Sequence, residues 1–262
     1  MGPRFALIVA LVALWVATVR TSTPIAVRVL TYNIHHGEGT DGQFDLARTA
    51  AIINSAQADL VALQEVDRHT RRSGRVDQLA ELERLTGSTG VFGKAMDFQD
   101  GTYGVAVLTR KPILRSVTRP LPVTPDREPR TSLTVDVPMR DGVHLQFTTT
   151  HLDQGRDPVN RLAQASFLND VLASTADAPA ILAGDLNSRP DTDVMALLER
   201  RWANLFPFPV PSAPPAAPRG LVDHVLARPA GHWRAVEAQA IDDRLASDHR
   251  PLLVVLEWEP AR

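Results

Sequence analysis

The stretch GDLNSRPD, residues 184–191, places a carboxylate and a carboxamide two positions apart, just after the apolar run PAILA. In an extended strand that ends there, alternation points the side chains of Asp185 and Asn187 to the same side. Asp and Asn are also favoured in turns for backbone reasons, so the pair equally fits a turn that caps the next helix. The alternative is that both side chains form the floor of a catalytic site.

Other acids, amides and imidazoles stand at the ends of apolar segments. They are Asn33 after VLTY, Glu65 after LVALQ, His151 after LQFTTT, Asp223 within LVDHV, and Asp248 and His249 just before PLLVVL. Taken singly, each residue has an ordinary interpretation as a turn former or a solvated side chain. Together they predict a site, because strand ends in layered α/β proteins gather on one rim, where binding and catalytic residues lie.

The segments that position these residues alternate between strand and helix patterns. Short apolar runs bounded by turn residues predict strands, and apolar residues that recur every three to four positions predict helices. The predicted strands are 26–33, 59–65, 102–110, 179–187, 221–227 and 251–258, with a hairpin over 131–151 that turns at Asp141–Gly142. The predicted helices are 44–56, 76–87, 157–174 and 191–201. Segment 207–220 is rich in proline and predicts a surface loop.

Composition limits the class of protein. The 262 residues are 44% hydrophobic and 22% charged, which is typical of a soluble enzyme-sized chain with one domain or at most two. The chain has no cysteine, so disulfides and thiolate zinc sites are excluded. The net charge of −2 argues against a dedicated duplex-DNA binder, because neutralisation of phosphates by basic residues drives the affinity of such proteins.

The N-terminus is a separate unit. Arg4 precedes an apolar run over residues 5–19, which matches the core of a signal peptide and is short for a membrane span. We therefore expect residues 1–23 to be a signal peptide or an N-terminal membrane anchor. The protein is then exported to the periplasm or outside the cell, or is anchored in a membrane, and residues 24–262 form the catalytic domain.

Seven blocks of sequence, in order, resemble the motifs of the endonuclease/exonuclease/phosphatase superfamily of metal-dependent phosphoesterases. They are VLTYNIHHG, DLVALQEVD, YGVAVLTR, TTTHL, LAGDLNSRP, LVDHV and SDHRPLLVVL. The resemblance implies a four-layer α/β/β/α sandwich, with two mixed sheets face to face and helices outside. Two longer blocks, TYNIHHGEGTDGQFDL and QEVDRHTRRSGRVDQ, are most similar to the hydrolase-like domain of glycosylphosphatidylinositol lipid-remodelling proteins.

The resemblance also implies a divalent metal ion, Mg²⁺ or Mn²⁺. Glu65 is then the main metal ligand, with Asn33 beside it and Asp248 in contact directly or through water. Hard oxygen ligands of this kind suit such ions. Asp185 would orient or deprotonate the attacking water, and Asn187 would hold a phosphate oxygen.

Further roles follow from the same resemblance. His249, paired with Asp223, would donate a proton or hydrogen bond as charge builds on phosphorus, since a nearby carboxylate raises the pKa of a histidine. His151 would contact the phosphate or assist the leaving group, and Tyr103 would help to place the phosphate. Arg72, in the Arg-rich loop, and Arg130 are weaker candidates for substrate contacts, because arginine forks bind phosphate.

The stretch HHGEG, residues 35–39, suggests zinc only superficially, because adjacent histidines in a strand point to opposite faces. His35 and His36 are instead expected to line the rim beside Asn33. We expect a monomeric phosphoesterase that acts on a lipid or small-molecule phosphodiester. The alternatives are a secreted non-specific nuclease, with nucleic acid as the substrate, and a catalytically dead binding module, which the complete set of site residues disfavours.

Overall fold

The computed structural model describes residues 24–259 apart from 173–177, 207–211 and 213–219, and its strands form two six-stranded mixed sheets. The first sheet has the order β11-β12-β1-β2-β4-β3, with β1 (Ile25–Asn33), β2 (Leu60–Arg68), β3 (Thr89–Phe98), β4 (Gly101–Thr109), β11 (Trp233–Ala240) and β12 (Leu252–Trp258). The second has the order β5-β6-β7-β8-β10-β9, with β5 (Arg115–Pro120), β6 (Thr131–Pro138), β7 (His144–His151), β8 (Ala180–Asp185), β9 (Ala203–Asn204) and β10 (Asp223–Arg228).

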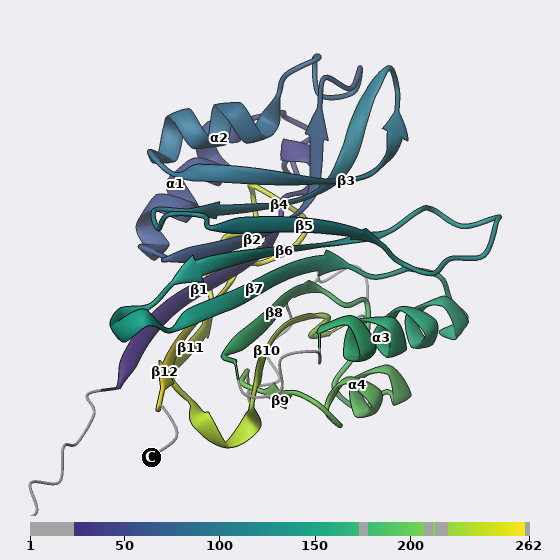
Figure 1. The fold of residues 1–262 in the computed structure, drawn as a ribbon. Helices are drawn as coiled ribbons and strands as arrows, with labels where there is room; N and C mark the ends of the chain where they lie inside the picture. Colours follow the sequence, from purple (N-terminus) through teal and green to yellow (C-terminus); the bar gives the residue numbers. More distant parts are fainter. Residues whose placement is uncertain (1–23, 173–177, 207–211, 213–219, 260–262) are drawn as a thin grey trace, which may run out of the picture.

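Helices cover the outer face of each sheet, so the described chain has four layers (Figure 1). Helices α1 (Leu46–Ala56) and α2 (Gln78–Thr86) lie on the first sheet, and α3 (Val159–Leu172) and α4 (Asp193–Leu198) lie on the second. Short 3-10 helices are η1 (His35–Gly37), η2 (Arg140–Gly142) and η3 (Ala230–His232). The predicted α/β/β/α sandwich is confirmed.

Three apolar cores hold the layers together. Phe147 belongs to the core between the two sheets. Ile53 of α1 and Leu82 of α2 pack on the first sheet, and Leu168 of α3 and Leu198 of α4 pack on the second. Each fully buried side chain of this size stabilises the fold by about 1.5–3 kcal/mol relative to exposure, before cavity effects. The central strands are buried on both faces, which explains their nearly continuous apolar runs.

Strand register brings the polar strand ends to one rim. Strands β1 and β2 are parallel, and Asn33 pairs with Gln64, the residue before Glu65. Strands β7 and β8 are also parallel, with His151 opposite Asp185. Strand β10 runs antiparallel to β8 and begins at Asp223, opposite Asp185. Pairing alone therefore aligns three site residues across the second sheet.

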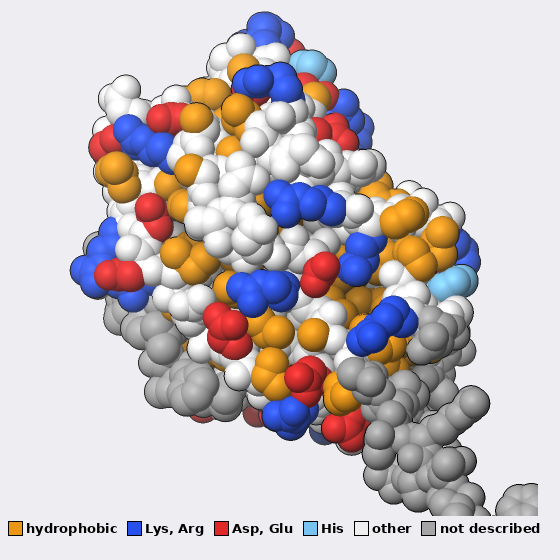
Figure 2. All heavy atoms as spheres, turned by 90° about the vertical axis from the view of Figure 1, so that its left-hand side faces the viewer, with side chains coloured by type: hydrophobic (Ala, Val, Ile, Leu, Met, Phe, Trp, Pro, Cys, Tyr) orange, Lys and Arg blue, Asp and Glu red, His pale blue; other side chains and the backbone are white. Residues whose placement is uncertain are grey.

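The described surface shows mixed charge on the face that lies at the left of Figure 1. Figure 2 shows Lys and Arg side chains interspersed there with Asp and Glu, with small apolar groups between them. Within the described residues, no helix has the length and hydrophobicity to cross a membrane. The predicted signal or anchor segment, residues 1–23, and most of the Pro-rich segment 207–220 lie outside the described residues.

Candidate active site

Asp185 is the centre of a cluster to which both sheets contribute. Its Oδ2 atom lies 3.2 Å from Nδ2 of Asn33, at the end of β1 in the first sheet. The same oxygen lies 3.4 Å from Nε2 of His151 and 3.7 Å from Nε2 of His249. Its Oδ1 atom accepts a hydrogen bond of 2.9 Å from the backbone N–H of Asn187. One carboxylate thus contacts an amide and two imidazoles.

His249 is held by a carboxylate on the side away from Asp185. Its Nδ1 lies 2.9 Å from Oδ2 of Asp223, which is 1% exposed, and its backbone N–H donates to Oγ of Ser247. Burial acts to lower the pKa of His249, but the Asp223 carboxylate outweighs it, and the pKa rises to about 10. The ring is therefore an imidazolium at neutral pH. Burial and the Asp223 charge raise the pKa of Asp185 to about 7.

The second imidazole beside Asp185 has the opposite charge preference. His151 is 4% exposed, and burial together with the Arg130 guanidinium lowers its pKa well below the usual value. Its Nδ1 atom is buried without a hydrogen-bond partner among the described residues. Asp185 accordingly lies between a neutral ring and a charged ring.

Glu65 is placed by an irregularity in β2. Pairing between β2 and β4 shifts between Leu63 and Val66, so the strand carries a bulge, and Glu65 has the left-handed φ of 59°. Its Oε1 accepts a hydrogen bond of 3.1 Å from Nδ2 of Asn33. Burial acts to raise the pKa of Glu65, but its contacts with His36 and Asn33 lower it far below the usual value. Glu65 is therefore an anion, with its side chain 22% exposed in the wall of a pocket.

A pocket of about 290 Å³ opens beside Glu65. Its lining residues come from the first sheet and from loops, some of which connect to strands of the second sheet. They are His35, His36, Glu65, Arg72, Met96, Phe98, Tyr103, Glu128, Arg130, Gln154 and Asp248. Tyr103 is buried, which raises its pKa, and its hydroxyl accepts a hydrogen bond of 3.4 Å from Arg130. Arg130 also pairs with Glu128 at 3.1 Å. The structure thus brings Arg72, Tyr103 and Arg130 to the same pocket as Glu65 and Asp248.

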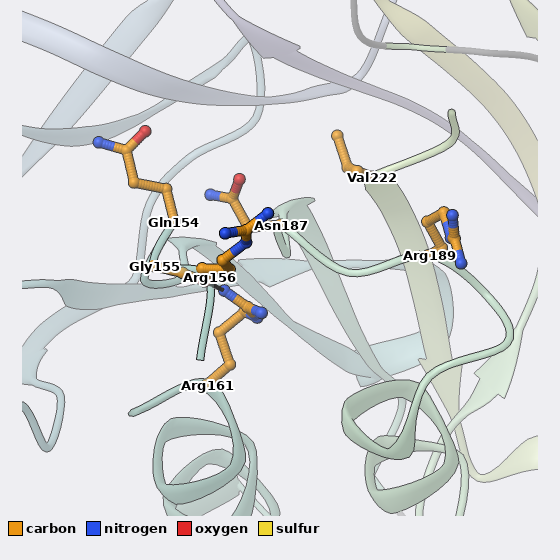
Figure 3. Close-up of a pocket in the computed structure, with 7 residues that line it drawn as sticks. All are labelled: Gln154, Gly155, Arg156, Arg161, Asn187, Arg189 and Val222. Atoms are coloured by element: carbon orange, nitrogen blue, oxygen red, sulfur yellow. Dashed lines mark hydrogen bonds between the residues drawn. The ribbon is translucent and has the colours of Figure 1, made fainter. Parts of the chain in front are cut away.

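A second pocket, of about 700 Å³, adjoins the cluster on the side of Asn187. Figure 3 shows its lining residues, which are Gln154, Gly155, Arg156, Arg161, Asn187, Arg189 and Val222. Arg161 points from the start of α3 toward the loop that carries Gly155, and it donates to the carbonyl oxygens of Asp153 and Gly155. Gln154 lines both pockets, so the two hollows meet at this residue.

The HHGEG segment departs from the predicted strand. His35 and His36 lie in η1, both with φ of 45°, and their ring centroids are 4.5 Å apart. The argument that their side chains point to opposite faces of a strand is therefore wrong, because Asn33 ends the strand. The expectation that they line the rim holds: the backbone N–H of His35 donates to Oδ1 of Asn33, and both line the pocket beside Glu65.

Comparison with known proteins identifies the fold. Residues 30–249 match the Endonuclease/Exonuclease/phosphatase family. The chain belongs to this family. Among solved structures, an endonuclease/exonuclease/phosphatase from Beutenbergia cavernae is 24% identical with a TM-score of 0.74, over 89% of this chain and 72% of that one. No curated protein matches the chain.

Two further solved structures share this fold. The Bacteroides thetaiotaomicron mannosyl-6-phosphatase is 20% identical with a TM-score of 0.68, over 88% of this chain and 99% of that one. The human Nocturnin catalytic domain, solved with a bound sulfate anion, is 17% identical with a TM-score of 0.70, over 90% of this chain and 94% of that one. At these identities the likeness shows the fold, and family membership shows the reaction type, hydrolysis of phosphate esters.

Members of the family generally depend on a divalent metal ion, and two groups of residues here offer ligand atoms. Atoms of Asp185, Asp223 and His249 lie within 4.8 Å of one another. However, Nδ1 of His249 is bonded to Asp223 and the ring is charged, so it has no lone pair to offer at neutral pH. Glu65 and Asp248 are carboxylates in one pocket, and they fit a hard cation better.

Several pocket residues were not predicted from the sequence. Met96 and Phe98 lie in β3, a strand that the sequence pattern does not predict, and Glu128 lies in the loop after β5. Gln154 lies two residues after the block TTTHL, so proximity to His151 was the available signal. The edge strand β3 and the connections that carry Glu128 and Gln154 have no clear periodic pattern in the sequence.

Proposed function

We propose that the protein is an exported phosphoesterase that uses Mg²⁺ or Mn²⁺ to hydrolyse a lipid or small-molecule phosphodiester. The observation that carries the proposal is the cluster around Asp185, with neutral His151 on one side and charged His249 on the other. Two titratable groups with opposed environments, within reach of one reacting centre, are the arrangement that acid–base hydrolysis needs.

Asp185 acts on the attacking water. A carboxylate with a pKa of about 7 is a stronger base than an ordinary Asp and is still partly ionised at neutral pH. Asn187 holds a phosphate oxygen, and its position is fixed by the bond from its backbone to Asp185. His249 donates to the oxygen on which negative charge develops, while Asp223 keeps the imidazole charged and oriented.

The remaining residues bind and place the substrate. Glu65 and Asp248, with Asn33 beside them, would hold the metal ion, which when bound neutralises charge on the phosphate. His151 contacts the phosphate or the leaving group. Tyr103 places the phosphate in the pocket, and Arg72 and Arg130, which line the same pocket, contact the substrate.

The choice of substrate class rests on charge and on sequence resemblance. The chain has a net charge of −2, and the face shown in Figure 2 mixes both signs, whereas proteins that bind duplex DNA concentrate basic residues. The blocks that resemble the lipid-remodelling hydrolase domain surround Asn33 and Glu65. We also assign residues 1–23 as the export segment, residues 24–262 as the catalytic domain, and the active form as a monomer.

A substrate panel tests the proposal. Phosphodiesters of glycerol, inositol and sugars, phospholipid vesicles, RNA and duplex DNA are compared at equal Mg²⁺ or Mn²⁺, with bis-p-nitrophenyl phosphate as a generic ester. We expect turnover that disappears in EDTA and returns with added metal, with lipid or small-molecule diesters cleaved faster than DNA. Full activity in EDTA would refute the metal requirement.

A secreted nuclease is the second candidate, and the larger pocket favours it. Three of its seven lining residues are arginines, which suit a run of phosphates that extends past Asn187. Nicking of plasmid DNA without cleavage of any lipid or small diester would establish this alternative. Binding of a phosphodiester with no turnover in either metal would instead indicate a binding module.

A further inference from the structure

Arg72 is held on one edge and lies against two aromatic rings in the wall of the smaller pocket. Its Nε and Nη2 atoms donate to Oδ2 and Oδ1 of Asp67 at 2.7 and 2.8 Å. Its guanidinium carbon lies 4.7 Å from the ring centroid of Phe98 and 5.4 Å from that of Tyr103. A guanidinium fixed in this way loses little freedom when it binds a ligand.

Asp67 is itself fixed by bonds that do not involve the pocket. It is 0% exposed, and its Oδ2 accepts a hydrogen bond of 2.7 Å from the hydroxyl of Thr70. Its backbone N–H donates to Oε1 of Gln78 at 2.8 Å, and Nε2 of Gln78 donates to the carbonyl oxygen of His36. A buried carboxylate is costly unless it is paired, and the bidentate bond to Arg72 supplies the pairing.

The pair leaves donors for a ligand. Within the described residues, Asp67 accepts from Nε and Nη2 of Arg72, so the N–H groups of Nη1 are available to the pocket. Asp67 does not line that pocket, and Arg72 does. The ion pair therefore links Arg72, which can contact a ligand in the pocket, to Asp67, which cannot.

We propose that Asp67 is a positioning residue, which holds Arg72 so that its free edge binds a non-bridging oxygen of the substrate phosphate. This rests on the phosphoesterase function proposed above and extends it to a buried residue behind the pocket. Asp67, Arg72 and Gln78 all belong to the block QEVDRHTRRSGRVDQ, which also carries Glu65. Of the arginines in this loop, Arg72 lines the pocket.

Asp67→Asn tests the proposal. Asn keeps the size of the side chain but removes the second acceptor and the charge, so Arg72 regains rotamer freedom that the substrate must then restrict. We expect KM to rise about tenfold and kcat to change less than about twofold, since one long side chain must be ordered on binding. Binding of inorganic phosphate in MgCl₂, measured by calorimetry, should weaken by the same factor.

Asp77→Asn is the matched control. Arg68 bonds to Asp77 through Nε and Nη2 and lies 5.4 Å from the ring centroid of Phe92, so it repeats the paired and stacked arrangement. Neither Arg68 nor Asp77 lines the pocket. Asn keeps the Oδ1 acceptor that caps α2 and removes only the charge that pairs with Arg68, so Tm should fall little while KM and the phosphate affinity stay unchanged.

A double variant separates positioning from general stability. If Asp67 acts through Arg72, Arg72→Ala raises KM and the addition of Asp67→Asn raises it no further. Additive increases, or an unchanged KM in folded Asp67→Asn, would overturn the inference.

If Asp67→Asn does not fold, Arg72→Lys replaces it: lysine keeps the charge without the fork, and KM should still approach that of Arg72→Ala. If wild type turns over no ester, the proposed function fails, and phosphate affinities alone decide the role of Asp67.

Discussion

Asp185 lies between two imidazoles that differ in charge, and this difference assigns separate tasks to the residues around it. His249 carries its charge because Asp223 faces its Nδ1 atom. His151 is neutral because it is buried beside Arg130. The same residue type thus supplies a charged donor on one side and an uncharged contact on the other.

Substitution of His249 and Glu65 distinguishes stabilisation of charge from metal binding. His249→Ala should lower kcat by roughly 10²–10³, the scale for loss of one donor to a developing oxyanion, with little change in the Mg²⁺ midpoint. Glu65→Ala should raise the Mg²⁺ midpoint, with partial recovery at high metal concentration. Titration of Mg²⁺ against kcat measures both effects. An equal shift of the midpoint in both variants would place His249 among the metal ligands.

The pH profile follows from the two raised pKa values. Asp185 must be deprotonated to accept a proton, so kcat should increase as pH rises through about 7. His249 must be protonated to donate, so kcat should decrease as pH rises through about 10. We expect a bell-shaped pH profile of kcat with its plateau between these values. Because the two groups interact, the two apparent pKa values belong to the pair and not to either residue alone. Asp223→Asn should move the alkaline limb to lower pH, and a limb that stays in place would contradict the assignment of His249.

At the scale of single elements, Gly184 determines how close β8 comes to β7. A Cβ atom on Gly184 would lie 2.0 Å from the carbonyl oxygen of Thr150, which is backbone and cannot move aside alone. Gly184→Ala should therefore destabilise the fold by about 1–3 kcal/mol and displace Asp185, the next residue. We expect a lower Tm together with a lower kcat, measured by thermal unfolding and steady-state kinetics. Gly142→Ala is the control for turnover, because nothing lies within 4 Å of its added Cβ, although its φ of 75° adds strain.

The sequence predicted the central strands and the residues at their ends, and it missed β3, β5, β9 and β11. These four are the edge strands of the two sheets. An edge strand is paired on one side only, and β3, β5 and β11 contain at most one buried residue each, so their apolar pattern is weak. The bulge at Glu65 was missed for another reason: it arises from pairing with β4, and nothing local in LVALQEVD marks it.

At the scale of the whole molecule, the described domain begins with β1 at Ile25, directly after the predicted export segment. A chain of residues 24–262 should therefore keep kcat and KM within about twofold of the full chain, because the site lies wholly within strands and loops after Ile25.

Fractionation should place the full chain outside the cytoplasm, and N-terminal sequencing would distinguish cleavage from anchoring. A cytoplasmic pool that retains Met1 or Gly2 would contradict export.

The site is divided between the two sheets: Asn33, Glu65 and Tyr103 belong to one, and His151, Asp185 and Asp223 to the other. Neither half holds a complete set of groups, so catalysis depends on the distance between two surfaces. An apolar core and polar contacts such as Asn33–Asp185 and Gln64–Thr149 hold these surfaces in register. The rate of turnover therefore reports whether the two sheets remain packed against each other. During gradual unfolding it should vanish when the sheets part, while each sheet with its own helices still contributes its circular dichroism.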